Sequence, residues 1–272
     1  MKLSADLQFQ TRVEANAWER LKQFTDARIA LGRVGGSLPT QPSLAFQLAH
    51  AQAKDAVLKP LDIEGLRLQL TVVNNEVLQV ESCAQDKDLY LKRPDLGREL
   101  SEASRQLLKD YVQSNPNTYD VVIVAGDGLS ARAIEDNAPY FMQQFYASCQ
   151  QAQWRVAPFV IATGSRVALG DEIAEILQAD MLVMLIGERP GLSSPDSMGI
   201  YYTWQARRGC HDAMRNCISN VRPAGLSTQL AIQRLLGLMN KSKQLGLSGV
   251  HLKDEHEMTI DTQDTTRPKR LF

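Results

Sequence analysis

The sequence predicts an α/β fold, a doubly wound and mostly parallel sheet preceded by an N-terminal helical region. Short, continuous apolar runs alternate with amphipathic helical patterns from about residue 86 onward. Runs without polar alternation indicate strands covered on both faces, which favours parallel pairing. Glycine closes two of these runs, at Gly126 and Gly187, as expected where a strand turns into a loop.

Length and charge narrow the class of protein. The 272 residues suffice for one large domain, or for a medium domain with a smaller one. Lys and Arg total 30 against 31 Asp and Glu, a net charge of −1, so there is no bulk attraction for nucleic acid or an acidic membrane surface. The sequence has no apolar stretch of membrane-spanning length and no secretory leader pattern. We expect a cytoplasmic protein with no nucleic-acid or membrane partner.

Residues 1–85 are expected to form a helical arm or subdomain. Apolar residues recur every three to five positions over 18–29, which favours a helix. The glycines and prolines of 32–42 then predict a loop or extended arm. A second helix is predicted over about 43–57, and this arm is the expected contact with another subunit.

Residues 86–253 carry the expected α/β domain, in a Rossmann-like arrangement. Residues 254–272 are polar and unpatterned, and are expected to be disordered. The predicted strands are 120–124, 155–161, 181–186 and 217–221. Four helices are predicted in this domain. The first opens at Pro94 and Asp95 and runs to Tyr111, and the second restarts at Asn137. The third begins at the cap Asp171, and the fourth runs from the cap Ser227 to Gly246.

Two glycine-containing loops follow expected strands, where ligands bind in open α/β sheets. The loop 126–131 does not match the dinucleotide fingerprint, the Walker loop or the nucleophile elbow. The alternative to a ligand-binding loop is therefore a plain turn between a strand and a helix. In the loop 187–192, Glu188 can accept hydrogen bonds from amide or hydroxyl groups of a ligand. The alternative is a local ion pair between Glu188 and Arg189.

No convincing catalytic constellation emerges from the residues. Ser130, Asp180 and His211 stand in the chain order of a hydrolase triad, which leaves a stand-alone hydrolase using Ser130 as an alternative. The four histidines lack ligand spacing and the four cysteines form no C-x-x-C pair, so we expect free thiols and no protein-ligated metal. A chain without its own catalytic set fits a subunit that assists another chain.

Five blocks of sequence, in order, resemble the light (small) chain of adenosylcobalamin-dependent ethanolamine ammonia-lyase. The resemblance runs from about residue 27 to 250, and five blocks in one order make a chance match improbable. The blocks are DLYLKRPDLGR at 88–98, DGLSA at 127–131, GSRV at 164–167, GERPGL at 187–192 and NCISN at 216–220.

The resemblance implies a subunit of a carbon–nitrogen lyase that converts ethanolamine to acetaldehyde and ammonia by a radical mechanism. A large chain would hold the substrate, and adenosylcobalamin (coenzyme B12) would lie between the two chains in a higher hetero-oligomer. Family contacts to the cofactor fall on Val167, Glu188 and Cys217, with no catalytic residue on this chain. A purely structural partner subunit is the remaining alternative.

The resemblance also bears on location. Some family members are packed in a bacterial microcompartment through a longer N-terminal extension. This chain starts close to the body of the fold, which argues against encapsulation by that route.

Overall fold

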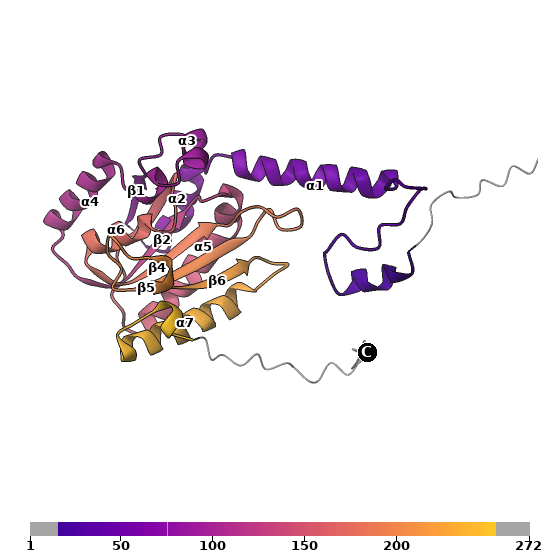
Figure 1. The fold of residues 1–272 in the computed structure, drawn as a ribbon. Helices are drawn as coiled ribbons and strands as arrows, with labels where there is room; N and C mark the ends of the chain where they lie inside the picture. Colours follow the sequence, from indigo (N-terminus) through magenta and orange to yellow (C-terminus); the bar gives the residue numbers. More distant parts are fainter. Residues whose placement is uncertain (1–15, 75, 254–272) are drawn as a thin grey trace, which may run out of the picture.

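The structure, a computed structural model, describes residues 16–74 and 76–253 and contains one six-stranded sheet with helices on both faces (Figure 1). The strand order across the sheet is β1-β3-β2-β4-β5-β6. The strands are β1 (Val77–Glu81), β2 (Tyr119–Gly126), β3 (Phe159–Thr163), β4 (Ala179–Gly187), β5 (Met198–Trp204) and β6 (Arg215–Val221).

The first four strands in this order are parallel, which confirms the predicted mostly parallel α/β sheet. β5 runs antiparallel to both β4 and β6. The register pairs Gly126 with Ile186, and Met198 with both Gly187 and Val221. The carboxyl ends of β1, β3, β2, β4 and β6 therefore share one edge of the sheet, which we call the carboxyl rim.

Helices form a layer on each face of the sheet. Buried residues of α2, α5 and α7 pack on one face, and those of α4 and α6 on the other. Short 3₁₀ turns lie at Ala17–Gln23, Leu96–Arg98, Asp212–Met214 and Gly249–His251. The helices are α1 (Thr40–Leu58), α2 (Ile63–Thr71), α3 (Lys87–Lys92), α4 (Glu102–Ser114), α5 (Ala131–Gln151), α6 (Leu169–Leu177) and α7 (Thr228–Leu245).

The central strands are covered on both faces, as their continuous apolar runs predicted. Along β2, Val121 and Ile123 contribute to the core beneath α5, whereas Val122 and Val124 contribute to the core beneath α6. All four side chains are fully buried. This two-sided burial is the reason these strands lack polar alternation.

Two strands were not predicted, and one was misplaced. β1 lies in the region expected to be helical. It was not predicted because, at the sheet edge, only part of its five-residue run is buried, so it lacks the continuous apolar run of a central strand. β5 breaks the expected alternation of strand and helix, since it returns antiparallel to β4 without a helix between them. β3 begins at Phe159 rather than at Arg155.

Helix starts also differ from the prediction. The helix expected to open at Pro94 and Asp95 and to run to Tyr111 is interrupted, because Leu100 bridges to Ser82 and α4 begins only after that bridge. The helix expected to restart at Asn137 is one continuous helix from Ala131, capped by Ser130. Pro139 is accommodated inside it.

Asp171 does not cap α6, as the sequence had suggested. The cap is Ala168, and Asp171 lies buried in the first turn, where its carboxylate meets the guanidinium of Arg215 at 2.5 and 2.7 Å. The adjacent Glu172 accepts hydrogen bonds from Arg105 (2.6 Å) and from the Leu100 backbone (3.1 Å). These two ion pairs, each with a buried carboxylate, tie β6 and α4 to α6.

One of the two helices predicted in the N-terminal part of the chain is confirmed. α1 matches the helix expected over 43–57, whereas the stripe over 18–29 forms only the short 3₁₀ turn. α1 extends away from the body of the molecule (Figure 1). Its side chains Leu44 and Leu48 are 58% and 61% exposed.

The predicted start and end of the last helix are confirmed. Ser227 caps α7 through the Leu230 N–H, and Gly246 ends it with φ +68°. The expected tail, 254–272, lies outside the described residues. Across residues 16–74 and 76–253, none of the helices has the length and apolar content needed to cross a membrane.

Candidate functional site

A recess of about 430 Å³ lies on the carboxyl rim, between the loops that follow β2, β3 and β4. It brings together Val167 and Glu188, which the sequence had singled out from separate blocks. Both residues are half-buried. The recess is lined by Tyr90, Leu129, Arg166, Val167, Ile186, Gly187, Glu188, Arg189 and Tyr201.

The Glu188 carboxylate is held from two sides. The Ser197 hydroxyl donates to Oε2 at 2.6 Å, and the Asn220 backbone N–H reaches the same oxygen at 3.3 Å. Gly199 packs so closely that an added Cβ would lie 2.9 Å from Oε1. Among the described residues, no ion pair forms between Glu188 and Arg189, so the local pair considered from sequence is not found. The carboxylate is oriented, and its Oε1 remains available as an acceptor.

Asp127, at the end of β2, organises the loop after β3. Its Oδ2 accepts the Gly164 N–H at 3.0 Å, and its Oδ1 accepts the Ser165 N–H at 3.0 Å and the Ser165 hydroxyl at 3.2 Å. This clamp fixes the backbone two residues before Val167. The negative charge of Asp127 is thus satisfied by donors of the protein itself.

Two cations surround the buried ring of Tyr90. The Arg166 guanidinium lies 4.1 Å and the Lys87 ammonium 4.8 Å from the ring centroid. Arg166 also donates to the Tyr90 carbonyl at 2.9 Å, and Lys87 donates to the Gly128 carbonyl at 2.9 Å. Burial lowers the pKa of Lys87, and the nearby Asp127 partly opposes this. The cluster anchors the 88–98 segment against the recess.

Cys217 lies beside the recess rather than at a strand end. It is the third residue of β6, pairs with Tyr201 of β5, and is exposed as a residue. The Tyr201 hydroxyl forms a hydrogen bond with its thiol. Partial burial of the thiol raises its pKa, the charge of Glu188 adds to this, and the Tyr201 hydrogen bond opposes it. At neutral pH the side chain is therefore a thiol and a weak nucleophile.

Close backbone contact joins the loops after β2 and β4. Gly128 has φ +56°, and a Cβ added there would collide with the Gly187 carbonyl. The Leu129 N–H donates to that same carbonyl at 2.9 Å. Only glycine permits this approach without strain.

The hydrolase triad is not assembled. The Ser130 hydroxyl is fully buried, donates to the Pro195 carbonyl at 2.8 Å and accepts the Ala133 N–H at 3.2 Å as a helix cap. Asp180 is the second residue of β4 and His211 precedes the turn before β6, so both lie at the edge of the sheet opposite Ser130. The stand-alone hydrolase interpretation is therefore wrong.

All five sequence blocks converge on the carboxyl rim. Besides the clamps already described, the Arg166 N–H donates to the Gly97 carbonyl at 2.8 Å, which joins the first block to the third. The second block contacts the third through Asp127 and the fourth through Leu129. The fourth joins the fifth through Glu188 and Asn220.

Comparison with known proteins agrees with this convergence. Residues 15–253 match the family described as "Ethanolamine ammonia-lyase light chain (EutC)". The chain belongs to the ethanolamine ammonia-lyase light chain family. An ethanolamine ammonia-lyase small subunit from Pseudomonas fluorescens is 50% identical over 258 residues, 94% of each chain. Another from Pseudomonas syringae pv. tomato is 47% identical over 252 residues, 92% of this chain and 88% of the relative.

Sequence reasoning had missed several residues of this light chain's recess. Tyr90 and Arg166 belong to the sequence blocks 88–98 and 164–167, but their spacing does not predict that the two side chains stack. Tyr201 belongs to the unpredicted strand β5, and Ser197 is the residue directly before that strand. The run MGIYYTW is rich in β-branched and aromatic residues, and this composition is the signal that would have found β5.

Proposed function

We propose that this chain, as a small subunit of ethanolamine ammonia-lyase, holds one side of adenosylcobalamin on its carboxyl rim. A large subunit would cover the other side and bind ethanolamine, which the assembled enzyme converts to acetaldehyde and ammonia. The observation that carries the proposal is the meeting of Val167 and Glu188 in one recess, with the Glu188 carboxylate already oriented by Ser197 and Asn220.

The chemistry of the recess fits a corrinoid. The corrin ring carries amide side chains, and a preoriented carboxylate such as that of Glu188 is a strong acceptor for an amide N–H. Val167 would contribute contact from the loop that Asp127 fixes. Cys217 and Tyr201 extend the same surface along β6 and β5.

The size of the recess supports contact on one side only. Pockets that enclose drug-sized ligands measure about 300–1,000 Å³, and a corrinoid is larger than such ligands. A recess of about 430 Å³ therefore accommodates an edge of the ring rather than the whole cofactor. The cofactor would supply the radical chemistry when bound, and this chain would supply orientation and exclusion of water.

The direct test is visible absorbance of adenosylcobalamin mixed with this chain, with its large subunit, and with both. We expect tight binding and ethanolamine deamination only when both chains are present. Complete turnover by this chain alone, or no spectral change in any mixture, would refute the proposal. A mixture that is active but insensitive to Glu188→Ala would instead favour a purely structural subunit.

A further inference from the structure

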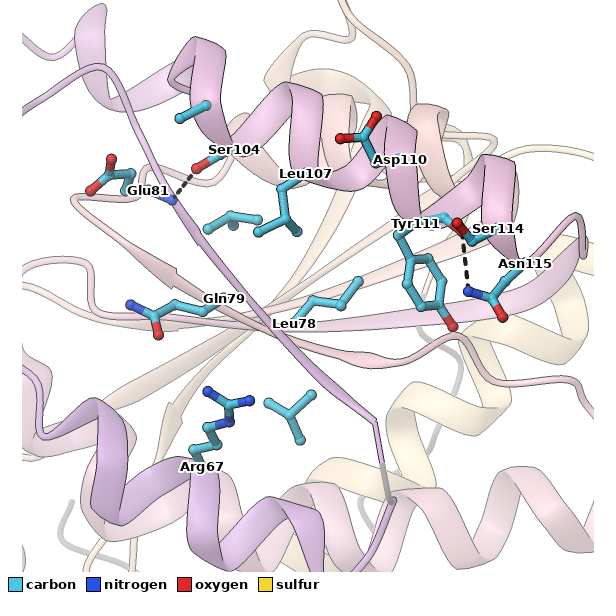
Figure 2. Close-up of a pocket in the computed structure, with 13 residues that line it drawn as sticks. Arg67, Leu78, Gln79, Glu81, Ser104, Leu107, Asp110, Tyr111, Ser114 and Asn115 are labelled. Atoms are coloured by element: carbon cyan, nitrogen blue, oxygen red, sulfur yellow. Dashed lines mark hydrogen bonds between the residues drawn. The ribbon is translucent and has the colours of Figure 1, made fainter.

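Within residues 16–74 and 76–253, β1 is the outermost strand of the sheet and pairs only with β3. A groove of about 770 Å³ follows its free edge, with α2 on one side and α4 on the other (Figure 2). This edge groove is separate from the recess on the carboxyl rim. An open edge strand of a sheet is a ready template for another strand, unless it is covered or blocked by charge.

Alternate residues of β1 bond to β3. The Glu76 carbonyl accepts the Phe159 N–H at 3.2 Å, and the Ser82 N–H donates to the Thr163 carbonyl at 3.0 Å. Since successive residues of a strand direct their backbone groups to opposite sides, the even-numbered residues between them face β3 as well. The odd-numbered residues of β1 therefore direct their N–H and C=O groups toward the groove.

The hydrogen bonds of Glu81 agree with this assignment. Its N–H donates to the Ser104 hydroxyl at 2.8 Å, and its carbonyl accepts the Ser101 N–H at 3.0 Å. The first turn of α4 thus covers the rim end of the edge. Val77 and Gln79 remain, and their four backbone groups point into the groove.

The two walls of the groove differ in chemistry (Figure 2). On the α4 side Leu78 and Leu107 form an apolar part, with Leu107 43% exposed, and Asp110 and Asn115 further along the helix are polar. Arg67 reaches in from α2 and forms no ion pair with any of the residues that the structure describes. A strand seated here would meet the exposed Leu107 on one face and the positive charge of Arg67 on the other.

We propose that an extended segment of the large subunit adds to the sheet alongside β1. Its backbone would pair with Val77 and Gln79, and its alternating side chains would be apolar toward Leu107 and acidic toward Arg67. This inference rests on the proposed function.

Continuity with the carboxyl rim supports this choice of occupant. The groove ends at Glu81, which also lines a pocket of about 280 Å³ on the rim. That pocket shares Tyr90 with the recess. The groove, this pocket and the recess are therefore consecutive neighbours, and a subunit that covers the recess would lie near the edge of β1.

Hydrogen exchange measured by mass spectrometry on this chain, alone and with the large subunit and adenosylcobalamin, tests the backbone pairing. We expect the amides of Val77 and Gln79 to exchange at least about tenfold more slowly in the complex, as for newly paired backbone groups. Gln79→Pro removes an N–H that points away from β3, so the sheet should persist. It should weaken assembly about tenfold, whereas the matched control Gln79→Ala keeps the N–H and should assemble normally.

A charge test avoids any change to the strand. Arg67→Glu should weaken assembly about tenfold, and the control Arg67→Lys should not. An active complex in which Val77 and Gln79 stay unprotected, and Gln79→Pro binds fully, would overturn strand addition but leave the proposed function intact. Absence of any complex would overturn both. Protection that arises from dimers of this chain alone would identify a second copy as the occupant and refute the large subunit.

Discussion

Asp127 and Ser165 are joined twice, since Oδ1 of the aspartate accepts both the backbone N–H and the hydroxyl of the serine, at 3.0 and 3.2 Å. The other oxygen accepts the Gly164 N–H. A carboxylate that accepts three hydrogen bonds makes the ends of β2 and β3 one unit. Val167 therefore owes its position on the rim to a side chain that lines no part of the recess.

Asp127→Asn should lower both stability and cofactor affinity. The amide nitrogen cannot accept hydrogen bonds, so at least one N–H of the loop loses its partner, at a cost of about 1–3 kcal/mol. Urea unfolding measures the first effect, and adenosylcobalamin titration of the two-chain complex measures the second. Asp136→Asn, on the exposed face of α5, is the control and should change neither. Wild-type affinity in Asp127→Asn would contradict a positioning role.

Glu188→Ala should weaken adenosylcobalamin binding while the complex of the two chains remains intact. Loss of a charged hydrogen-bond partner costs about 1.5–3 kcal/mol, or roughly tenfold or more in affinity. Absorbance titration gives the affinity, and size-exclusion chromatography with light scattering gives the assembly. Asp136→Ala serves as the control, since this exposed carboxylate on α5 lies outside the recess. An unchanged affinity in Glu188→Ala would show that the carboxylate does not touch the cofactor.

Cys217 should react slowly with iodoacetamide at pH 7, and faster as the pH rises above its ordinary pKa. Its thiol pKa is raised, so the thiolate fraction is small at neutral pH. Tyr201→Phe removes the hydrogen bond that lowers this pKa, and should therefore slow alkylation further. Bound adenosylcobalamin should protect Cys217 in the complex but leave the reactivity of Cys210 unchanged, as peptide mass spectrometry would report. Faster alkylation of Tyr201→Phe would contradict the assignment.

Ser130 should fail to react with a fluorophosphonate probe, because its hydroxyl is buried and serves as a helix cap. Ser130→Ala should cost about 0.5–2 kcal/mol of stability through loss of that cap. Chemical denaturation measures this cost. Activity of the assembled enzyme, measured well below its unfolding temperature, should stay near that of the wild type. Covalent labelling of Ser130 by the probe would reopen the hydrolase interpretation.

Glu172 should make the protein sensitive to acid. Burial alone would raise its pKa, but the hydrogen bonds from Arg105 and from the Leu100 backbone outweigh this and lower it. Because the folded pKa lies below the unfolded value of about 4.3, this stabilisation is complete above that pH and is lost as the pH falls through the folded pKa. Glu172→Gln should cost about 3 kcal/mol at pH 7 and progressively less below pH 4. The exposed Glu102→Gln is the control for denaturation measured across this pH range.

The central part of the fold was predictable from sequence because burial dictates it. β2 and β4 are continuously apolar from Val121 and Met181 onward, since both faces are covered there, and these runs identified the two strands directly. β1 and β5 were not predicted, because β1 lies at the sheet edge and β5 reverses direction. Neither therefore follows the pattern of a parallel strand between helices. The start of α4 was not predicted correctly, because the bridge between Leu100 and Ser82 joins residues distant in sequence.

The candidate site was predictable only in part, for a similar reason. The resemblance supplied Val167, Glu188 and Cys217, and the structure brings the first two into one recess. Their support comes from contacts that no local pattern encodes, such as the hydrogen bond from Ser197 to Glu188. The same holds for the stacking of Arg166 on Tyr90, which depends on how the loop after β3 returns to the 88–98 segment.

The exposed apolar side chains of α1 have a consequence for how the cell makes this chain. Copies translated in excess of the large subunit would keep Leu44 and Leu48 in water, on a helix that extends away from the body. Such surfaces promote self-association and recognition by chaperones and proteases. Production of the protein in recombinant hosts should therefore depend on matched synthesis of the two chains, and surplus light chain should be recovered in the insoluble fraction.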